Sequence, residues 1–249
     1  MLHRRSGLPD GWLDIVERRV AVWSTLDDEE RELIASIADW MLRHKHWEAS
    51  RGFALDDQIR VTVAVGAALL VMRLGHEEYR EVSAIIVYPS AMKSAGTRAG
   101  PVLGTASDDV IPVLGEAHDQ RGPVILAWDE AREAARHPGR GHNVVYHEFA
   151  HKIDMLDSIM DGTPPLRRRD DLARWVEVCT EVYRSLLDGA DRPPIDPYGA
   201  TNPAEFFAVA TEAFFDVPRA LAAQEPALYD VMRDFYKQDP ATRPSLEMS

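Results

Sequence analysis

The stretch His147-Glu148-Phe149-Ala150-His151 has the spacing H-E-x-x-H. Two histidines and a glutamate do not complete a catalytic site, so the rest of the chain is searched for a third metal ligand and for supporting groups. Residues four apart share one face of a helix, so both imidazoles can reach a single zinc ion. Glu148, one step round the helix, can then address a water at that ion. The pattern is typical of hydrolases that use a metal.

The residues around the pentapeptide predict a loop followed by a helix. Gly139 and Gly141 interrupt the chain, and an apolar pattern follows from Val144 to Leu156. That pattern leaves His147 and His151 together on a neighbouring stripe of the helix. A chance pentapeptide in an unrelated α-helical protein is the alternative, and it predicts no stoichiometric zinc.

Composition indicates a globular protein with enough apolar residues for a sizeable core in its 249 residues. The formal net charge of −13 argues against nucleic acid or an anionic membrane as the main partner, because both require a basic surface. The longest apolar stretch, Val61 to Met72, is too short to span a bilayer.

Cysteine usage and the N-terminus indicate a cytoplasmic protein. Cys179 is the only cysteine, so an intramolecular disulfide and a thiolate-rich zinc site are both excluded. It lies in an apolar pattern with Trp175 and Val182, which predicts a buried thiol. Arg4 and Arg5 are not followed by the apolar core of a signal peptide.

Hydrophobic patterning predicts an α+β fold that is rich in helices and has a small sheet beside the H-E-x-x-H helix. The expected helices are two within residues 13–47 and one each over 61–74 and 130–136, and the expected strands are 83–88 and 122–128. Residues 93–120 are expected to be irregular or to form a hairpin. We expect one domain over residues 1–238, with a helical part at about 12–75, a catalytic part at about 80–238, and a poorly ordered tail over 239–249.

The strand that precedes the H-E-x-x-H helix has two interpretations. An exposed sheet edge can pair with an extended peptide and hold it beside the metal. A strand whose two edges are already paired has no such role. The sequence does not decide between them.

A catalytic zinc usually takes three protein ligands and keeps one position for water. The predicted helix Asn202 to Phe215 offers two candidates, Glu205 and Glu212, which share a face because they are seven residues apart. Asn202, Pro203 and Glu205 also form a capping-box pattern, in which Glu205 would only close the helix start. Position alone therefore favours neither glutamate.

Longer segments carry a resemblance to a known family. They are Gly141 to Asp157, Asp161 to Leu166, Tyr198 to Thr201 with the helix to Phe215, Gly122 to Asp129 and Ile85 to Pro89. Together, over roughly residues 12–238, the chain resembles the Mlc titration factor A family of zinc peptidases. That family is similar to the catalytic domain of anthrax lethal factor, which implies a zincin-like fold with a glutamate-zincin site.

The resemblance implies roles for particular residues. His147, His151 and Glu205 would be the zinc ligands, and Glu148 would be the general base. Tyr198, seven residues before Glu205, would assist catalysis, and this spacing selects Glu205 over Glu212. Glu212 would then be a supporting carboxylate. Independently of the resemblance, Asp154 lies one turn after His151 and is a candidate for orienting a histidine, with a solvated or capping aspartate as the alternative.

The implied function is zinc-dependent hydrolysis of peptide bonds, with aminopeptidase activity and binding of a transcriptional repressor as family properties. The chain lacks a Gly-x-Met-Glu-Asn element for holding a substrate amine, so exopeptidase specificity does not follow. The alternative is a non-catalytic protein that titrates a repressor and whose zinc site is structural or vestigial. The intact Glu148 argues against that alternative, because a structural site needs no general base.

Overall fold

The computed structural model describes residues 7–50, 52–90, 122–157 and 159–245. Its N-terminal part contains α1 (Trp12–Arg19), α2 (Asp28–His44) and α3 (Asp57–Val71), which confirms the predicted helices of this region. Asp27 caps α2 through a reciprocal pair of bonds with Glu30, whose backbone N–H lies 2.8 Å from Oδ1 of Asp27. The acidic run at the start of α2 thus marks the helix start, as expected.

Three parallel strands form the sheet in the order β1 (His46–Ala49), β2 (Ala84–Tyr88) and β3 (Val124–Ala127). The two predicted strands are confirmed. The sequence analysis missed β1, because its side chains alternate between exposed and half-buried and give little apolar signal. Within the described part of the chain, β3 pairs with β2 alone. Residues 93–120, expected to be irregular or a hairpin, lie outside the described residues.

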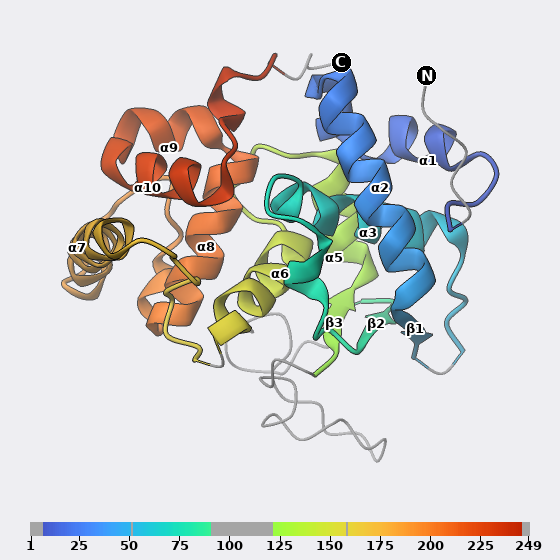
Figure 1. The fold of residues 1–249 in the computed structure, drawn as a ribbon, viewed down its shortest axis with the longest axis horizontal. Coiled ribbons are helices and arrows are strands. Elements are labelled where there is room, and N and C mark those ends of the chain that lie inside the picture. Colours follow the sequence, from blue (N-terminus) through green and yellow to red (C-terminus); the bar gives the residue numbers. More distant parts are fainter. Residues whose placement is uncertain (1–6, 51, 91–121, 158, 246–249) are drawn as a thin grey trace.

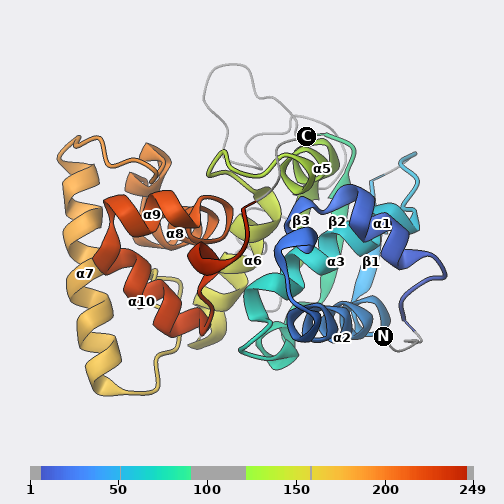
Figure 2. The same ribbon diagram turned by 90° about the horizontal axis from the view of Figure 1, so that it is seen from above.

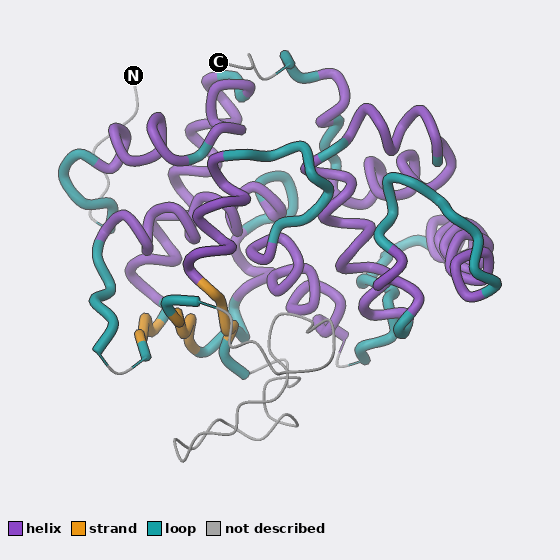
Figure 3. The backbone as a smooth tube through the Cα atoms, turned by 180° about the vertical axis from the view of Figure 1, so that it is seen from behind, coloured by secondary structure: helices purple, strands orange, loops and turns teal. Residues whose placement is uncertain are grey.

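The second half of the described chain consists of helices, and the strands occupy a small region at one end of the molecule (Figure 3). These helices are α5 (Trp128–Arg136), α6 (Val144–Asp154), α7 (Arg169–Leu187), α8 (Pro203–Asp216), α9 (Pro218–Gln224) and α10 (Pro226–Tyr236). In Figures 1 and 2, α6 lies between the N-terminal helices with their sheet and the group α7 to α10. The helix that carries H-E-x-x-H is therefore the central element of the fold.

The inner helices of this arrangement are almost completely buried. The apolar stretch from Val61 to Met72 lies in and just after α3, and its side chains are shielded from solvent. Gly66 lets α3 approach α6, because a Cβ atom there would lie 3.2 Å from a methyl group of Val145. None of the helices in the described ranges is long and apolar enough to cross a membrane.

The outermost helix, α7, packs through one narrow stripe. Its buried residues are Trp175, Cys179, Val182 and Leu186, spaced three or four apart as an amphipathic helix requires. Burial raises the pKa of the Cys179 thiol to about 12. The prediction of a buried cysteine is confirmed.

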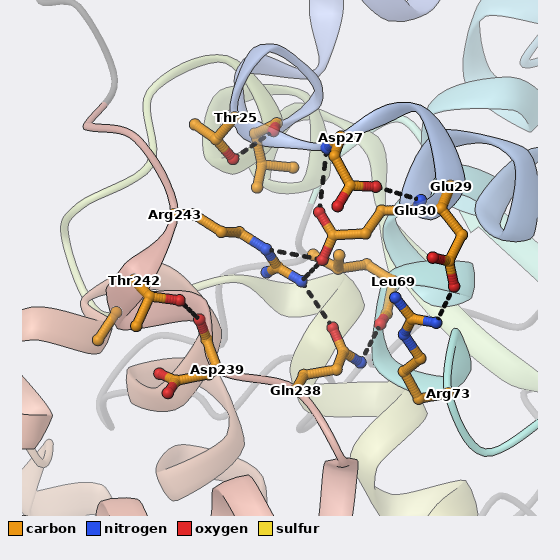
Figure 4. Close-up of polar contacts among 12 residues, drawn as sticks. Thr25, Asp27, Glu29, Glu30, Leu69, Arg73, Gln238, Asp239, Thr242 and Arg243 are labelled. Atoms are coloured by element: carbon orange, nitrogen blue, oxygen red, sulfur yellow. Dashed lines mark hydrogen bonds and ion pairs between the residues drawn. The ribbon is translucent and has the colours of Figure 1, made fainter.

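The C-terminal segment corrects one expectation. Residues 239–245 were expected to be part of a poorly ordered tail, but they include a 3-10 turn (Pro240–Thr242) and pack against the N-terminal helices. Arg243 bonds Glu30 at 2.8 Å and Gln238 at 2.9 Å, and Gln238 donates to the Leu69 carbonyl at 2.8 Å (Figure 4). These contacts connect α2, α3 and the end of α10, and no local sequence pattern reports them.

The ion pair of Arg243 with Glu30 is expected to stabilise the fold. Both side chains are largely buried, at 9% and 14% exposure, so Arg243→Ala leaves the Glu30 carboxylate short of a partner. We expect the free energy of unfolding to fall by about 2 kcal/mol, measured by urea denaturation. Arg233→Ala is the control, because its ion pair with Asp230 is exposed and is worth about 0.5 kcal/mol or less. Equal losses in the two variants would contradict the prediction.

Candidate metal centre

The site begins with the loop that positions the start of α6. Asn143 caps the helix, since its side-chain oxygen accepts from the backbone N–H groups of Val145 and Tyr146 at 3.1 and 3.3 Å. One carboxylate oxygen of Asp216, at the end of α8, accepts from Gly139 at 2.9 Å and from Gly141 at 2.6 Å. The glycine-broken loop is therefore held by the C-terminal end of α8.

Three side chains converge where α6 meets the start of α8. Nε2 of His147 lies 3.2 Å from Nε2 of His151, and Oε2 of Glu205 lies 3.0 and 3.6 Å from these two atoms. One potential ligand atom from each residue falls within 4.8 Å of the others. In the described part of the chain, this is the one cluster of three or more such residues with that spacing.

The donor set fits a zinc ion. Two imidazole nitrogens and one carboxylate oxygen are ligands that catalytic zinc takes in proteins. Oε2 of Glu205 is buried, and within the described residues it makes no hydrogen bond of normal geometry, although both imidazoles are close. Three convergent polar atoms that leave each other poorly satisfied are the arrangement that a bound cation would complete.

Glu205 takes part in capping α8 through its backbone, and its side chain faces the two histidines. Its backbone N–H donates to the side chain of Asn202 at 2.9 Å, which caps α8 as predicted. Its carboxylate faces the two histidines. The cap places Glu205 in the first turn of α8 and leaves its side chain available to the site.

Glu212 lies on the other side of His147. Its Oε1 atom is 3.4 Å from Nδ1 of His147, 3.3 Å from Nδ1 of His142, and 3.2 Å from the backbone nitrogen of Asn143, which donates to it. Glu205 is thus beside the Nε2 atoms and Glu212 beside Nδ1. A carboxylate at the second ring nitrogen orients an imidazole and sets its tautomer.

Charge within the cluster is strongly coupled. Burial alone would lower the pKa of His147, but its contacts with Glu205 and Glu212 raise that pKa to about 10. Burial would raise the pKa of Glu205, but His147 and His151 outweigh it and hold that pKa well below its usual range. Without a metal, the pair is an imidazolium and a carboxylate, so a metal ion at Nε2 must displace a proton.

Glu148 and Tyr198 border the cluster and have raised pKa values. Burial is the main cause for Glu148, and the nearby charge of Glu205 adds to it. Tyr198, in a 3-10 turn (Pro197–Ala200), is half-buried with its ring centre 6.2 Å from that of His147. Burial and the charges of Glu205 and Glu148 raise its pKa to about 12, so its hydroxyl is a hydrogen-bond donor at neutral pH.

Asp154 is connected to the segment that follows α6. Its Oδ2 atom accepts a hydrogen bond from the backbone N–H of Gly162 at 3.0 Å. Its role in orienting a histidine stays a prediction. The sequence analysis assigned no role to His142, Gly162 or Asp216. The contacts of His142 with Glu212 and of Asp216 with Gly141 join segments far apart in the chain, which no local pattern predicts.

Comparisons with known proteins agree with this geometry. The family described as glucose-regulated metallo-peptidase M90 matches residues 1–237. An uncharacterised protein of Synechocystis sp., slr2042, is 35% identical over 94% of this chain and 86% of its own length. Mlc titration factor A of Serratia proteamaculans is 31% identical over 93% of this chain and 88% of its own length. The protein of the same name from Yersinia pestis is 30% identical over 90% and 83%.

The raised pKa of His147 predicts how the stability of the metal-free protein depends on pH. The folded state holds the proton more tightly than the unfolded state, whose histidine titrates near 6.5. This contribution is fully present below pH 6.5 and is lost as the pH rises towards about 10. We expect the difference in unfolding free energy between the native chain and His147→Gln, both in chelator, to shrink over that range. A difference that is constant with pH would contradict the assignment.

Proposed function

Because the chain belongs to the glucose-regulated metallo-peptidase family M90, we propose that it hydrolyses peptide bonds at a zinc ion held by His147, His151 and Glu205. The membership confirms the resemblance to the Mlc titration factor A family. The observation that carries the proposal is the convergence of two imidazole nitrogens and one carboxylate oxygen beside Glu148. A helix-rich fold with a small parallel sheet is compatible with the zincin-like architecture expected from the sequence.

When bound, zinc supplies a Lewis acid that lowers the pKa of water and polarises the scissile carbonyl. Glu148 accepts a proton from the attacking water at its carboxylate and returns it to the leaving amine nitrogen. Its raised pKa suits both steps, because proton transfer in each direction is best served by a group that titrates closer to neutral pH.

Glu212 and Tyr198 have supporting roles in this proposal. Glu212 fixes the ring of His147 through Nδ1 and so directs Nε2 towards Glu205 and His151. Tyr198 donates a hydrogen bond from its hydroxyl to the carbonyl oxygen of the substrate as that oxygen gains negative charge. Its high pKa keeps the proton in place for this bond.

Glu148→Gln tests the chemistry directly. The amide keeps the size of the side chain but cannot accept the proton, so peptide cleavage should fall about a thousandfold while zinc content stays at the native level. Cleavage of a mixed peptide library followed by mass spectrometry, with metal analysis of the same sample, measures both. Glu177→Gln, on the exposed side of α7, is the control.

The native protein in this experiment also separates the proposal from its main alternative. The relatives from Serratia proteamaculans and Yersinia pestis bear the name Mlc titration factor A, which suggests a protein that binds a transcriptional repressor. A native chain that holds zinc but cleaves no member of the library would favour such a titration protein with a structural or vestigial site. Aminopeptidase specificity would appear as loss of single N-terminal residues from the library peptides.

Tyr198→Phe tests the role of the hydroxyl. Removing a donor that acts only as charge develops should lower kcat about a hundredfold and leave KM and zinc content close to native. Steady-state kinetics on a peptide found in the library measure the two constants. Tyr183→Phe is the matched control, because Tyr183 packs on Phe206 through its ring and phenylalanine keeps that contact. A raised KM with unchanged kcat would assign Tyr198 to substrate binding instead.

A further inference from the structure

Gly162 lies in the segment between α6 and α7, and both its backbone N–H and its carbonyl oxygen are hydrogen-bonded. Its N–H donates to Oδ2 of Asp154 at 3.0 Å, and its carbonyl accepts from Nε1 of Trp175 at 3.2 Å. Both bonds are buried. Asp154 is fully shielded from solvent, and Trp175 is 2% exposed.

The third contact of Gly162 is with the start of α8. Its φ of +79° is in the left-handed region, and a Cβ atom on it would lie 2.2 Å from the carbonyl oxygen of Pro203 and 2.7 Å from the carbonyl carbon. Side-chain carbon atoms do not approach backbone atoms this closely, so only glycine fits without a shift of one segment. The chain at Gly162 therefore touches the backbone of α8 directly.

These contacts connect the two helices that carry the convergent side chains. Asp154 is three residues after His151 on α6, and Pro203 is two residues before Glu205 on α8. Gly162 thus fills the space between the C-terminal end of α6 and the N-terminal end of α8, next to the cluster.

The opposite ends of the same helices are joined by Asp216 and Glu212. Asp216 is eleven residues from Glu205, which is about 16 Å along a helix. A helix held at one end can pivot, and the displacement is largest at the far end. Zinc requires its ligand atoms within about 0.2 Å of their preferred distances, so the Glu205 end needs a support of its own.

We propose that Gly162 is a positioning residue that sets where Glu205 stands relative to His147 and His151. It acts as a spacer of minimal thickness, which Asp154 and Trp175 hold in place against Pro203. This inference rests on the proposed role of Glu205 as a metal ligand, and it does not depend on which substrate is cleaved.

Gly162→Ala and Gly189→Ala form a matched pair for the test. Gly189, just after α7, has a φ of +81° and no atom within 4 Å of its added Cβ, so both variants carry the strain of a positive φ. Only Gly162→Ala presses on Pro203. We expect it to bind zinc about ten- to a hundredfold more weakly than the native chain, whereas Gly189→Ala binds zinc as the native chain does. Competition with a chromophoric chelator measures both affinities.

Trp175→Phe is a milder variant that serves if Gly162→Ala does not fold. Phenylalanine keeps a ring against Phe207 and Phe235 but removes the Nε1 donor to Gly162. We expect zinc binding about fivefold weaker, as the loss of one hydrogen bond implies. Cobalt bound in place of zinc should show an altered visible spectrum in both variants, which a purely global loss of stability would not produce.

A crystal structure of Gly162→Ala distinguishes this inference from the peptidase proposal. If Oε2 of Glu205 keeps its native distances to both histidines, the positioning role is wrong, whether or not the native protein cleaves peptides. Native-like zinc affinity in both Gly162→Ala and Trp175→Phe would overturn it as well. A native chain that binds zinc without cleaving peptides would overturn only the catalytic proposal.

Discussion

The antiparallel packing of α6 on α8 is the constraint on which the rest of the site depends. Three carboxylates of α8, at positions 205, 212 and 216, lie on one face because their spacings of seven and four residues match whole helical turns. Asp216 meets the loop before α6, Glu212 meets its first turns, and Glu205 meets both histidines. The register of the two helices and the assembly of the cluster are therefore one feature. A slip of one turn would place every carboxylate beside the wrong partner.

This arrangement places charge in a region where charge is expensive to bury. The pKa values of Asp216 and Glu148 are raised by burial, whereas those of Glu205 and Glu212 are lowered by the imidazoles beside them. Glu205 and Glu212 lie beside rings that can carry a proton, and these outweigh burial. At Asp216 the backbone N–H groups also lower the pKa, but by less than burial raises it. The contact between α6 and α8 thus keeps one proton on His147, and a cation can replace that proton.

The sequence predicts those parts of the molecule that depend on local patterns. The cap at Asn202, the acidic start of α2, the buried α3 and strands β2 and β3 all follow from residues close together in the chain. The two histidines follow from their spacing, and the choice of Glu205 required the family resemblance. Strand β1 and residues 239–245 were missed, because β1 depends on pairing with β2 and Arg243 on a partner 213 residues away. No local pattern could reveal that Gly162 contacts the backbone of Pro203.

The two sides of the site are supported in different ways. α6 is packed between α3 and α8, and the approach at Gly66 leaves little space for it to move towards α3. His147 and His151, four residues apart on this single helix, therefore keep their relative positions in any motion that leaves α6 intact. Glu205 and Tyr198 belong to the other side, on α8 and the 3-10 turn packed against it. A small displacement of α8 along α6 would thus move the Glu205 carboxylate and the Tyr198 hydroxyl together while the H-E-x-x-H residues stayed in place. The relative position of α6 and α8, more than the pentapeptide itself, therefore determines whether the two histidines and Glu205 converge.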